Sequence, residues 1–391
     1  MSVSRQLFLM VSFVLPLFTS MMTYANETAK PIRIGVSLGL TGSYEKMSQL
    51  QSRAFKLWEK QVNDRGGVLG RPVQITIQDD ASNADNAKKI YEDFILRDKV
   101  DFVFGPFSSA LTSAIVPLTE KHGYPTLASG AASDDLWRRG YQRLFSLTAS
   151  ADRYTIGLLS ILSEANIKRL AIVHTDDVFA VSLAEGTKKW AAEYGVEIVL
   201  FHKVLKNTAD LTQAAQAARD SGAEAILMSG HDPESINMRK ALKQINWTPK
   251  AYYASIGPGL NAYRSALGED AEGTFSSSIW EDHEGLKLPG SMEFLRGYTS
   301  AYNEQPSYHA ARAYAAAQIL EYAIKVADST ERKAVEKALF QIDVNTLIGR
   351  YVVDRTGAQI KGFPMIIQWQ KGKREIVWPE KLQTAQPVFN K

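Results

Sequence analysis

The sequence contains no cysteine and only six histidines among its 391 residues. Without cysteine the chain can form no disulfide framework and has no lipid-attachment site of the bacterial lipoprotein kind. The histidines show no pair at the spacing of metal ligands. A Walker phosphate loop is absent, and the glycines of residues 35–42 do not form a dinucleotide fingerprint. We therefore expect no metal, no cofactor and no enzymatic activity.

Long apolar runs are also missing, except near the start of the chain. Arg5 precedes an apolar run at residues 7–18, and small residues at Thr23 and Ala25 follow. This pattern is typical of a secretory signal peptide, and we expect cleavage after about Ala25 and a monomeric protein in a Gram-negative periplasm. The formal net charge is +3, and only Arg5 lies in the predicted signal, so the rest carries +2 (3 − 1). That balance favours neither nucleic acid nor an anionic membrane as a partner.

What the sequence has is a repeated alternation of short apolar segments with amphipathic ones. Strands are predicted at residues 32–38, 73–77, 101–104, 124–128, 170–173, 196–201, 225–228 and 251–254, and helices lie between most of them. This order predicts parallel sheets that are covered by helices on both faces, which is an α/β fold.

The alternation changes after about residue 273. A strand at 274–279 is followed by three helices, at 290–303, 308–326 and 331–340, and then by short strands with turn residues between them. This pattern predicts a chain that leaves one lobe, builds a second, and returns. We expect the crossings near residues 146–150, 273–278 and 347–351.

Two of the predicted strands end in loops of small residues. The strand at 101–104 runs into Gly105-Pro106, and Ser108 or Ser109 then caps a helix. The strand at 124–128 ends in Ser129-Gly-Ala-Ala-Ser133. Hydroxyls and free backbone N–H groups at a helix N-terminus favour anions, so a small carboxylate is the expected guest. An ordinary N-cap beside an ordinary turn would look the same.

Several motifs, in this order and spacing, resemble the branched-chain amino-acid family of type I periplasmic solute-binding proteins. They include Val62-Asn-Asp-Arg-Gly-Gly-Val-Leu-Gly-Arg-Pro-Val73, Phe104-Gly-Pro-Phe-Ser-Ser109, Arg139-Gly-Tyr-Gln142 and Gly268-Glu-Asp-Ala-Glu-Gly273. The resemblance covers nearly the whole chain after the signal. It implies two Rossmann-like lobes with three hinge crossings and a ligand between them. Residues 26–147 and 277–347 would form the first lobe, and residues 148–276 and 348–391 the second.

The resemblance also implies which residues of the first lobe contact the ligand. Its carboxylate would be held by the hydroxyl and backbone N–H of Ser109, beside Ser108, and by the loop from Ser129 to Ser133. Within that loop Gly130 offers backbone, and Ala132 stands where a threonine is usual, with Ser133 as its replacement. Met47 stands where an aromatic side chain commonly packs on the ligand.

In the second lobe the resemblance implies three contact positions. Phe179 and His231 each stand where the family often has a tyrosine. Ile256 stands where a glutamate usually receives an α-ammonium group. An aliphatic side chain accepts no hydrogen bond, so the sequence favours a carboxylate ligand without an ammonium group, such as an aromatic or branched aliphatic acid. The alternative is that Asp232 or Glu281 reaches in and the ligand is a hydrophobic amino acid.

The resemblance implies an importer component that delivers its ligand to an inner-membrane ABC permease. A ligand sensor that passes the same closure to a receptor or regulator is an alternative. A secreted hydrolase, with Asp79-Asp80 as a carboxylate pair, is a weaker one. Adjacent permease and ATPase genes would favour the importer, and an adjacent sensor kinase would favour the sensor.

Overall fold

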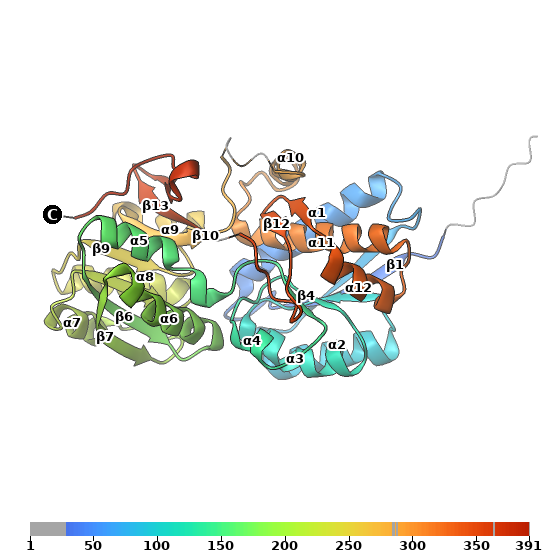
Figure 1. Cartoon of the computed structure of the whole chain (residues 1–391), viewed down its shortest axis with the longest axis horizontal. Helices are drawn as coiled ribbons and strands as arrows, with labels where there is room; N and C mark the ends of the chain where they lie inside the picture. Colours follow the sequence, from blue (N-terminus) through green and yellow to red (C-terminus); the bar gives the residue numbers. More distant parts are fainter. Residues whose placement is uncertain (1–28, 284–285, 287, 363, 391) are drawn as a thin grey trace, which may run out of the picture.

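The computed structural model describes residues 29–283, 286, 288–362 and 364–390. They form two lobes that lie side by side along the long axis of the molecule, each built on one large sheet (Figure 1). The predicted signal peptide, residues 1–25, lies outside the described residues. No helix within the described ranges has the length and apolar character needed to cross a membrane.

The first lobe contains a parallel sheet in the order β2-β1-β3-β4-β5. Its strands are β1 (Ile32–Leu38), β2 (Val73–Asp79), β3 (Phe102–Phe104), β4 (Thr126–Ala128) and β5 (Leu144–Ser146). The order reverses between β1 and β3, so a crevice opens there at the carboxyl ends of the strands.

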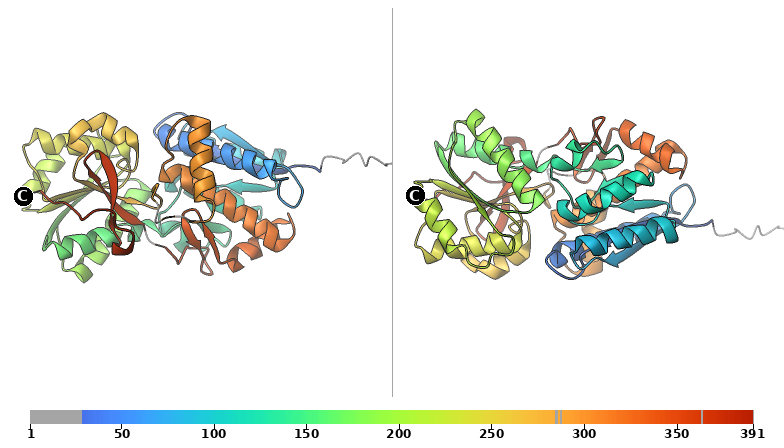
Figure 2. Two further views of the ribbon diagram at one scale, coloured as in Figure 1. Left: turned by 90° about the horizontal axis from the view of Figure 1, so that it is seen from above. Right: turned by 90° about the horizontal axis from the view of Figure 1, so that it is seen from below.

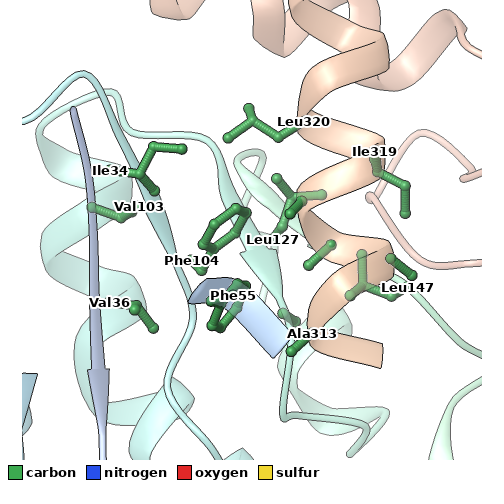
Figure 3. Close-up of a cluster of buried hydrophobic side chains, with 14 of the residues drawn as sticks. Ile34, Val36, Phe55, Val103, Phe104, Leu127, Leu147, Ala313, Ile319 and Leu320 are labelled. Atoms are coloured by element: carbon green, nitrogen blue, oxygen red, sulfur yellow. The ribbon is translucent and has the colours of Figure 1, made fainter. Parts of the chain in front are cut away.

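Helices cover both faces of this sheet. They are α1 (Glu45–Asp64), α2 (Ala84–Glu92), η1 (Asp93–Arg97), α3 (Ser109–Lys121), α4 (Asp135–Arg138), α10 (Ser291–Tyr302), α11 (Tyr308–Ala327) and α12 (Arg332–Gln341). In Figure 1, α1 and α11 lie on one face and α2 and α3 on the other. Phe55 of α1 stacks on Phe104 of β3 at 4.7 Å between ring centroids, and Ile319 of α11 joins the same core (Figure 3).

The second lobe contains a seven-stranded sheet in the order β14-β13-β10-β9-β8-β6-β7. Its strands are β6 (Arg169–Thr175), β7 (Glu197–Val204), β8 (Ala225–Ser229), β9 (Ala251–Ala254), β10 (Thr274–Ser278), β13 (Met365–Gln370) and β14 (Lys373–Trp378). All pairings are parallel except β10 with β13 and β13 with β14. Five of its strands, in the order β7-β6-β8-β9-β10, repeat the order β2-β1-β3-β4-β5 of the first sheet. The strand order in this sheet therefore reverses between β6 and β8.

Alternate residues of these strands are buried on opposite faces, because helices cover both sides. Leu170 and Ile172 of β6 pack in one core, while Ala171 and Val173 pack in the other. The helical elements of this lobe are η2 (Ala151–Arg153), α5 (Ile156–Glu164), α6 (Val178–Ala191), η3 (Ala192–Tyr194), α7 (Thr212–Asp220), α8 (Asp232–Gln244), α9 (Asn261–Leu267), η4 (Gly268–Ala271) and η6 (Glu380–Leu382). Burial on both faces explains why the strands have continuous apolar sequences.

The order of the elements takes the chain between the lobes three times, and the two lobes are seen from above and from below in Figure 2. The first two passages follow β5 and β10, close to the predicted positions. Near the third predicted crossing, β11 (Val344–Thr346) and β12 (Gly349–Tyr351) instead form a hairpin. Tyr351 and Val353 belong to the core of the first lobe. We therefore propose that the third crossing lies after Val353 and before β13, and that the first lobe extends beyond residue 347.

One motif of hydrolases occurs in the sequence, because Gly35-Val-Ser-Leu-Gly39 has the Gly-x-Ser-x-Gly spacing. In the structure this segment is part of β1 and its end rather than a strand-to-helix elbow. Ser37 is fully buried and its hydroxyl donates to Asp80 at 2.7 Å. Ser37 is therefore a structural residue and is not placed as a nucleophile.

Candidate functional site

The strand-end loops of the two sheets face each other between the lobes. Ser108 follows β3 and Gly130 follows β4 in the first lobe, while Phe179, His231 and Ile256 follow β6, β8 and β9 in the second. These loops lie next to the two positions where strand order reverses. Open α/β sheets bind their ligands at such positions.

A narrow cavity of about 30 Å³ lies at this junction. The residues that line it are Phe107, Ser108, Ser109, Gly130, Ala132, Tyr154, Phe179, His231, Ile256, Tyr308, His309 and Arg312. Seven of the ten predicted site residues are among them, and both lobes contribute. A small molecule held here would touch both lobes at once.

The two small-residue loops of the first lobe are tied to each other. Ser108 is the N-cap of α3, and its hydroxyl accepts a hydrogen bond from the Leu111 N–H at 3.2 Å. Its φ of 99° is a strained conformation for a residue with a side chain. The hydroxyl oxygen of Ser109 accepts from the N–H groups of Ala132 and Ser133, at 3.1 and 3.0 Å. Ser109 thus joins the loops, in addition to lining the cavity.

Replacing Ser109 with alanine is expected to lower the free energy of unfolding by about 1–3 kcal/mol, because two buried N–H groups lose their acceptor. Urea denaturation of the ligand-free protein measures this loss. Ser160→Ala is the matched control, since the Ser160 hydroxyl donates to Glu164 at the surface, 3.0 Å away, and its effect is expected to stay within about 0.5 kcal/mol. Equal stabilities of the two variants would contradict the joining role of Ser109.

Three predicted site residues do not line the cavity. Met47 is fully buried in the core of the first lobe. An aromatic residue at the N-cap of α1, Tyr44, lies nearer, with its ring centroid 5.4 Å from Phe107 and 5.3 Å from His231. Ser129 donates its hydroxyl to the Gly105 carbonyl at 2.8 Å. Ser133 lines a neighbouring surface groove instead.

In the second lobe, His231 lies against an ionised carboxylate. His231 Nε2 is 3.5 Å from Asp177 Oδ1, and both side chains are buried. Burial opposes the charge on Asp177, but His231 and the hydrogen bonds from Thr175 and the Ala180 N–H outweigh it and hold the pKa of Asp177 far below its usual value. The Asp177 carboxylate is thereby occupied, and it also caps α6.

The two acidic residues considered as ammonium acceptors also have basic partners. Asp232 accepts from Lys46 Nζ at 2.9 Å, and Glu281 accepts from Arg374 Nε at 3.0 Å. Ile256 lines the cavity, and its carbonyl accepts from Ser235 Oγ. The hydroxyl of Ser255 exchanges hydrogen bonds with both the N–H and the carbonyl of Gly230. The acceptors that sequence reasoning offered near Ile256 are therefore engaged within the protein.

The first turn of α11 adds three residues that sequence reasoning missed, Tyr308, His309 and Arg312. Burial raises the pKa of Tyr308 well above its usual value. Burial, together with the charges of Arg312 and His231, lowers the pKa of His309 to about 3, so its imidazole is neutral at pH 7. The sequence carries one signal, since Arg312 stands among alanines in the largely apolar segment 308–327.

Arg312 is only 5% exposed, yet no Asp or Glu of the described chain forms an ion pair with it. Its Nη2 donates to the carbonyls of Ala128, at 3.3 Å, and Ala131. Its Nε has no hydrogen-bond partner. Burial lowers the pKa of Arg312, which nevertheless stays protonated at neutral pH. A buried, charged donor without an acid partner is costly unless a ligand supplies one.

Direct contacts hold the lobes together around the cavity. Lys46 pairs with Asp232, Lys206 Nζ donates to the Tyr44 hydroxyl at 2.6 Å, and Ser182 Oγ donates to Asp134 at 2.5 Å. Each contact joins a residue of the first lobe to one of the second. The structure is therefore a closed arrangement of the two lobes. No cluster of three or more potential metal ligands is found in the described part of the chain.

A fold of two parallel-sheet lobes with a cavity between them is typical of periplasmic binding proteins. The model of the family "Periplasmic binding protein" matches residues 31–374. The chain belongs to this family, which is one of solute-binding proteins and not of enzymes. The predicted α/β fold with two lobes is confirmed.

Known relatives are similar over almost their whole length. The Leu/Ile/Val-binding protein homolog 7 of Brucella melitensis is 22% identical over 373 residues, which cover 91% of this chain and 93% of that protein. A branched-chain amino acid transporter substrate-binding protein from Streptococcus pneumoniae, in complex with isoleucine, has a TM-score of 0.80 at 22% identity, covering 92% of this chain and 100% of that one. A solute-binding protein of an ABC transporter from Rhodopseudomonas palustris, in complex with benzoate, has a TM-score of 0.78 at 17% identity, covering 92% and 97%.

Proposed function

We propose that this protein is the substrate-binding component of an ABC importer and that it captures a small carboxylate between its lobes. The observation that carries the proposal is the cavity itself, which residues of both lobes line and which contains a buried arginine without an acid partner. Closure removes water from such a site and strengthens each polar contact within it. A micromolar dissociation constant requires about 8 kcal/mol, and a few charge-assisted hydrogen bonds of about 1.5–3 kcal/mol supply much of it.

The similar proteins support both candidate ligand classes, since one solved relative contains isoleucine and another benzoate. The predicted signal peptide supports export to the periplasm, with cleavage after about Ala25. The mature protein then acts there as a monomer. Its macromolecular partner is then an inner-membrane ABC permease. Sensing through a receptor uses the same two-lobed closure and remains the alternative; an adjacent permease gene favours import.

A thermal-shift screen of the purified protein tests capture directly. We expect at least one compound among leucine, valine, phenylalanine, benzoate and branched-chain keto acids to raise the melting temperature, because a ligand that binds only the folded state stabilises it. Nuclear magnetic resonance of the same mixture should show the compound unchanged after incubation. Conversion of the compound would favour the hydrolase alternative instead.

Binding is also expected to reduce the radius of gyration. The contacts Lys46–Asp232 and Lys206–Tyr44 exist only when the lobes are together, and exposed ion pairs contribute only about 0.2–1 kcal/mol each. A ligand that touches both lobes therefore shifts the population toward the closed form. Small-angle X-ray scattering with and without the ligand measures the change, and an identical profile at saturation would contradict hinge closure.

A further inference from the structure

The cavity is chemically asymmetric. The described residues that line it include one permanent cation, Arg312, and no Asp or Glu. Much of the remaining lining is aromatic, from Phe107, Phe179, Tyr154 and Tyr308. A ligand that matches these surroundings has one negative group and an apolar or aromatic body.

The serine loops offer a carboxylate fewer free hydrogen-bonding groups than their sequence indicates. The Ser108 hydroxyl caps α3, and the Ser109 hydroxyl oxygen accepts from two N–H groups of the second loop. Those N–H groups, of Ala132 and Ser133, are likewise occupied. The strongest donor in the cavity that still lacks an acceptor is the Nε–H of Arg312.

Arg312 is also held firmly in place. Its Nη2 donates to the carbonyls of Ala128 and Ala131, which belong to the end of β4 and the loop that follows it. These two bonds fix the plane of the guanidinium group, and a fixed guanidinium fork is well suited to binding a carboxylate. The group is thus positioned before any ligand arrives.

An α-ammonium group meets the opposite situation. It would lie in the same small cavity as the Arg312 charge, and like charges at short range are unfavourable when water is excluded. Asp177 accepts hydrogen bonds from the Thr175 hydroxyl and from two backbone N–H groups at the start of α6. Asp232 and Glu281 are paired with Lys46 and Arg374, respectively. The aromatic rings offer a cation only weak attraction by comparison.

Granting the proposed function, we propose that Arg312 binds the carboxylate of the ligand and that this ligand is a small organic acid without an α-ammonium group. Branched aliphatic keto acids and aromatic acids fit this description, while the corresponding amino acids do not. The proposal assigns the role of acid-binding residue to the first turn of α11 rather than to the loop at Ser109.

Matched pairs of compounds test the ligand class by isothermal titration calorimetry. The pairs are 4-methyl-2-oxopentanoate with L-leucine, phenylpyruvate with L-phenylalanine, and benzoate with benzamide. We expect at least one acid to bind about tenfold or more tightly than its partner, because the amino acids bring an ammonium group that finds no free acid beside Arg312 and benzamide lacks the carboxylate. Tighter binding of leucine or phenylalanine would overturn the ligand class while leaving capture by the cleft intact. If none of the six binds, both the ligand class and the proposed capture of small carboxylates are overturned.

Variants test the residue. Arg312→Gln keeps a donor for the two carbonyls but has no charge, and it is expected to weaken binding of the acid about 10- to 100-fold. Arg312→Lys keeps the positive charge but not the planar guanidinium group, so its affinity for the acid should lie between those of the wild type and Arg312→Gln. Arg143→Gln is the control, because Arg143 pairs with Glu120 and Glu336 and does not line the cavity; its affinity should equal that of the wild type. Unchanged affinity in Arg312→Gln would overturn the assignment.

The melting temperature without ligand separates binding from a structural role. Removing an unpaired buried charge relieves the free protein of its desolvation cost, so Arg312→Gln should melt at or above the wild-type temperature while losing affinity. An arginine that serves only structure would show the reverse, a lower melting temperature with unchanged affinity for the bound acid, and that result would overturn the proposal.

Discussion

Lowering the pH from 7 to 4 is expected to reduce the free energy of unfolding, with His309 alone contributing about 3 kcal/mol of the loss. Burial and the neighbouring Arg312 and His231 lower the pKa of His309 to about 3. Between that pKa and its value of about 6.5 in the unfolded chain, only the unfolded state binds the proton. Stability therefore rises with pH throughout this interval, and it falls as the solution is acidified.

Urea denaturation at several pH values, compared between the wild type and His309→Phe, measures this effect. Phenylalanine keeps the ring contacts of His309 with Tyr308 and Phe107 but cannot be protonated. Asp177 does not interfere, because its pKa is lowered in the folded state and its contribution is lost only below the unfolded value of about 3.9. The wild-type slope in His309→Phe would contradict this assignment.

Gly130→Ala is expected to destabilise the protein by about 1–3 kcal/mol or more and to abolish high-affinity binding. A Cβ atom at Gly130 would lie 2.5 Å from the Phe107 Cα and 2.8 Å from the Pro106 carbonyl oxygen. These are backbone atoms, so no side-chain rotation relieves the contact. The β-bridge between Phe107 and Gly130 would open, and the two loops that line the cavity would separate.

Gly105→Ala provides a matched control in the same pair of loops. A Cβ atom there would meet the Ala128 Cα and the Leu127 oxygen at 3.4 Å and the Thr112 Oγ1 at 3.7 Å, which are ordinary contacts, and Gly105 does not have a positive φ. Its stability and its affinity for ligand should remain close to those of the wild type. Chemical denaturation measures the stability of both variants, and calorimetry measures their affinity for ligand. Equal stability and equal affinity in Gly130→Ala and Gly105→Ala would contradict the need for close contact between the two loops.

Most of the fold could be predicted because its central strands are buried on both faces. Continuous apolar segments such as Leu170 to Val173 are hard to place elsewhere than in the middle of a covered sheet. The third crossing that we propose lies later than the sequence predicts, because the β11–β12 hairpin has the same local pattern as a strand that enters a new sheet. Local sequence does not say which core a short strand joins.

The candidate site was predictable only where it lies at strand ends. Ser108, Gly130, Phe179, His231 and Ile256 all follow a predicted strand, so topology brings them together. Arg312 lies in a helix that topology alone does not aim at the cleft, and 181 residues separate it from Ala131, to whose carbonyl it donates. That Met47 does not line the cavity could not be predicted for a similar reason, because the rotation of α1 about its axis decides which side chain faces the cavity.

The packing of α11 against α1 has a consequence for the order in which the protein is made. Trp58 Nε1 donates to Glu321 Oε2 at 3.1 Å, across 263 residues of chain. At a synthesis rate of about 5–20 residues per second, Trp58 leaves the ribosome roughly 13–50 s before its partner exists. Strands β6 to β10 of the second lobe are synthesised in that interval. Strands β13 and β14 of the same lobe are synthesised only after Glu321. Neither lobe can therefore complete its packing until nearly all of the chain has been synthesised.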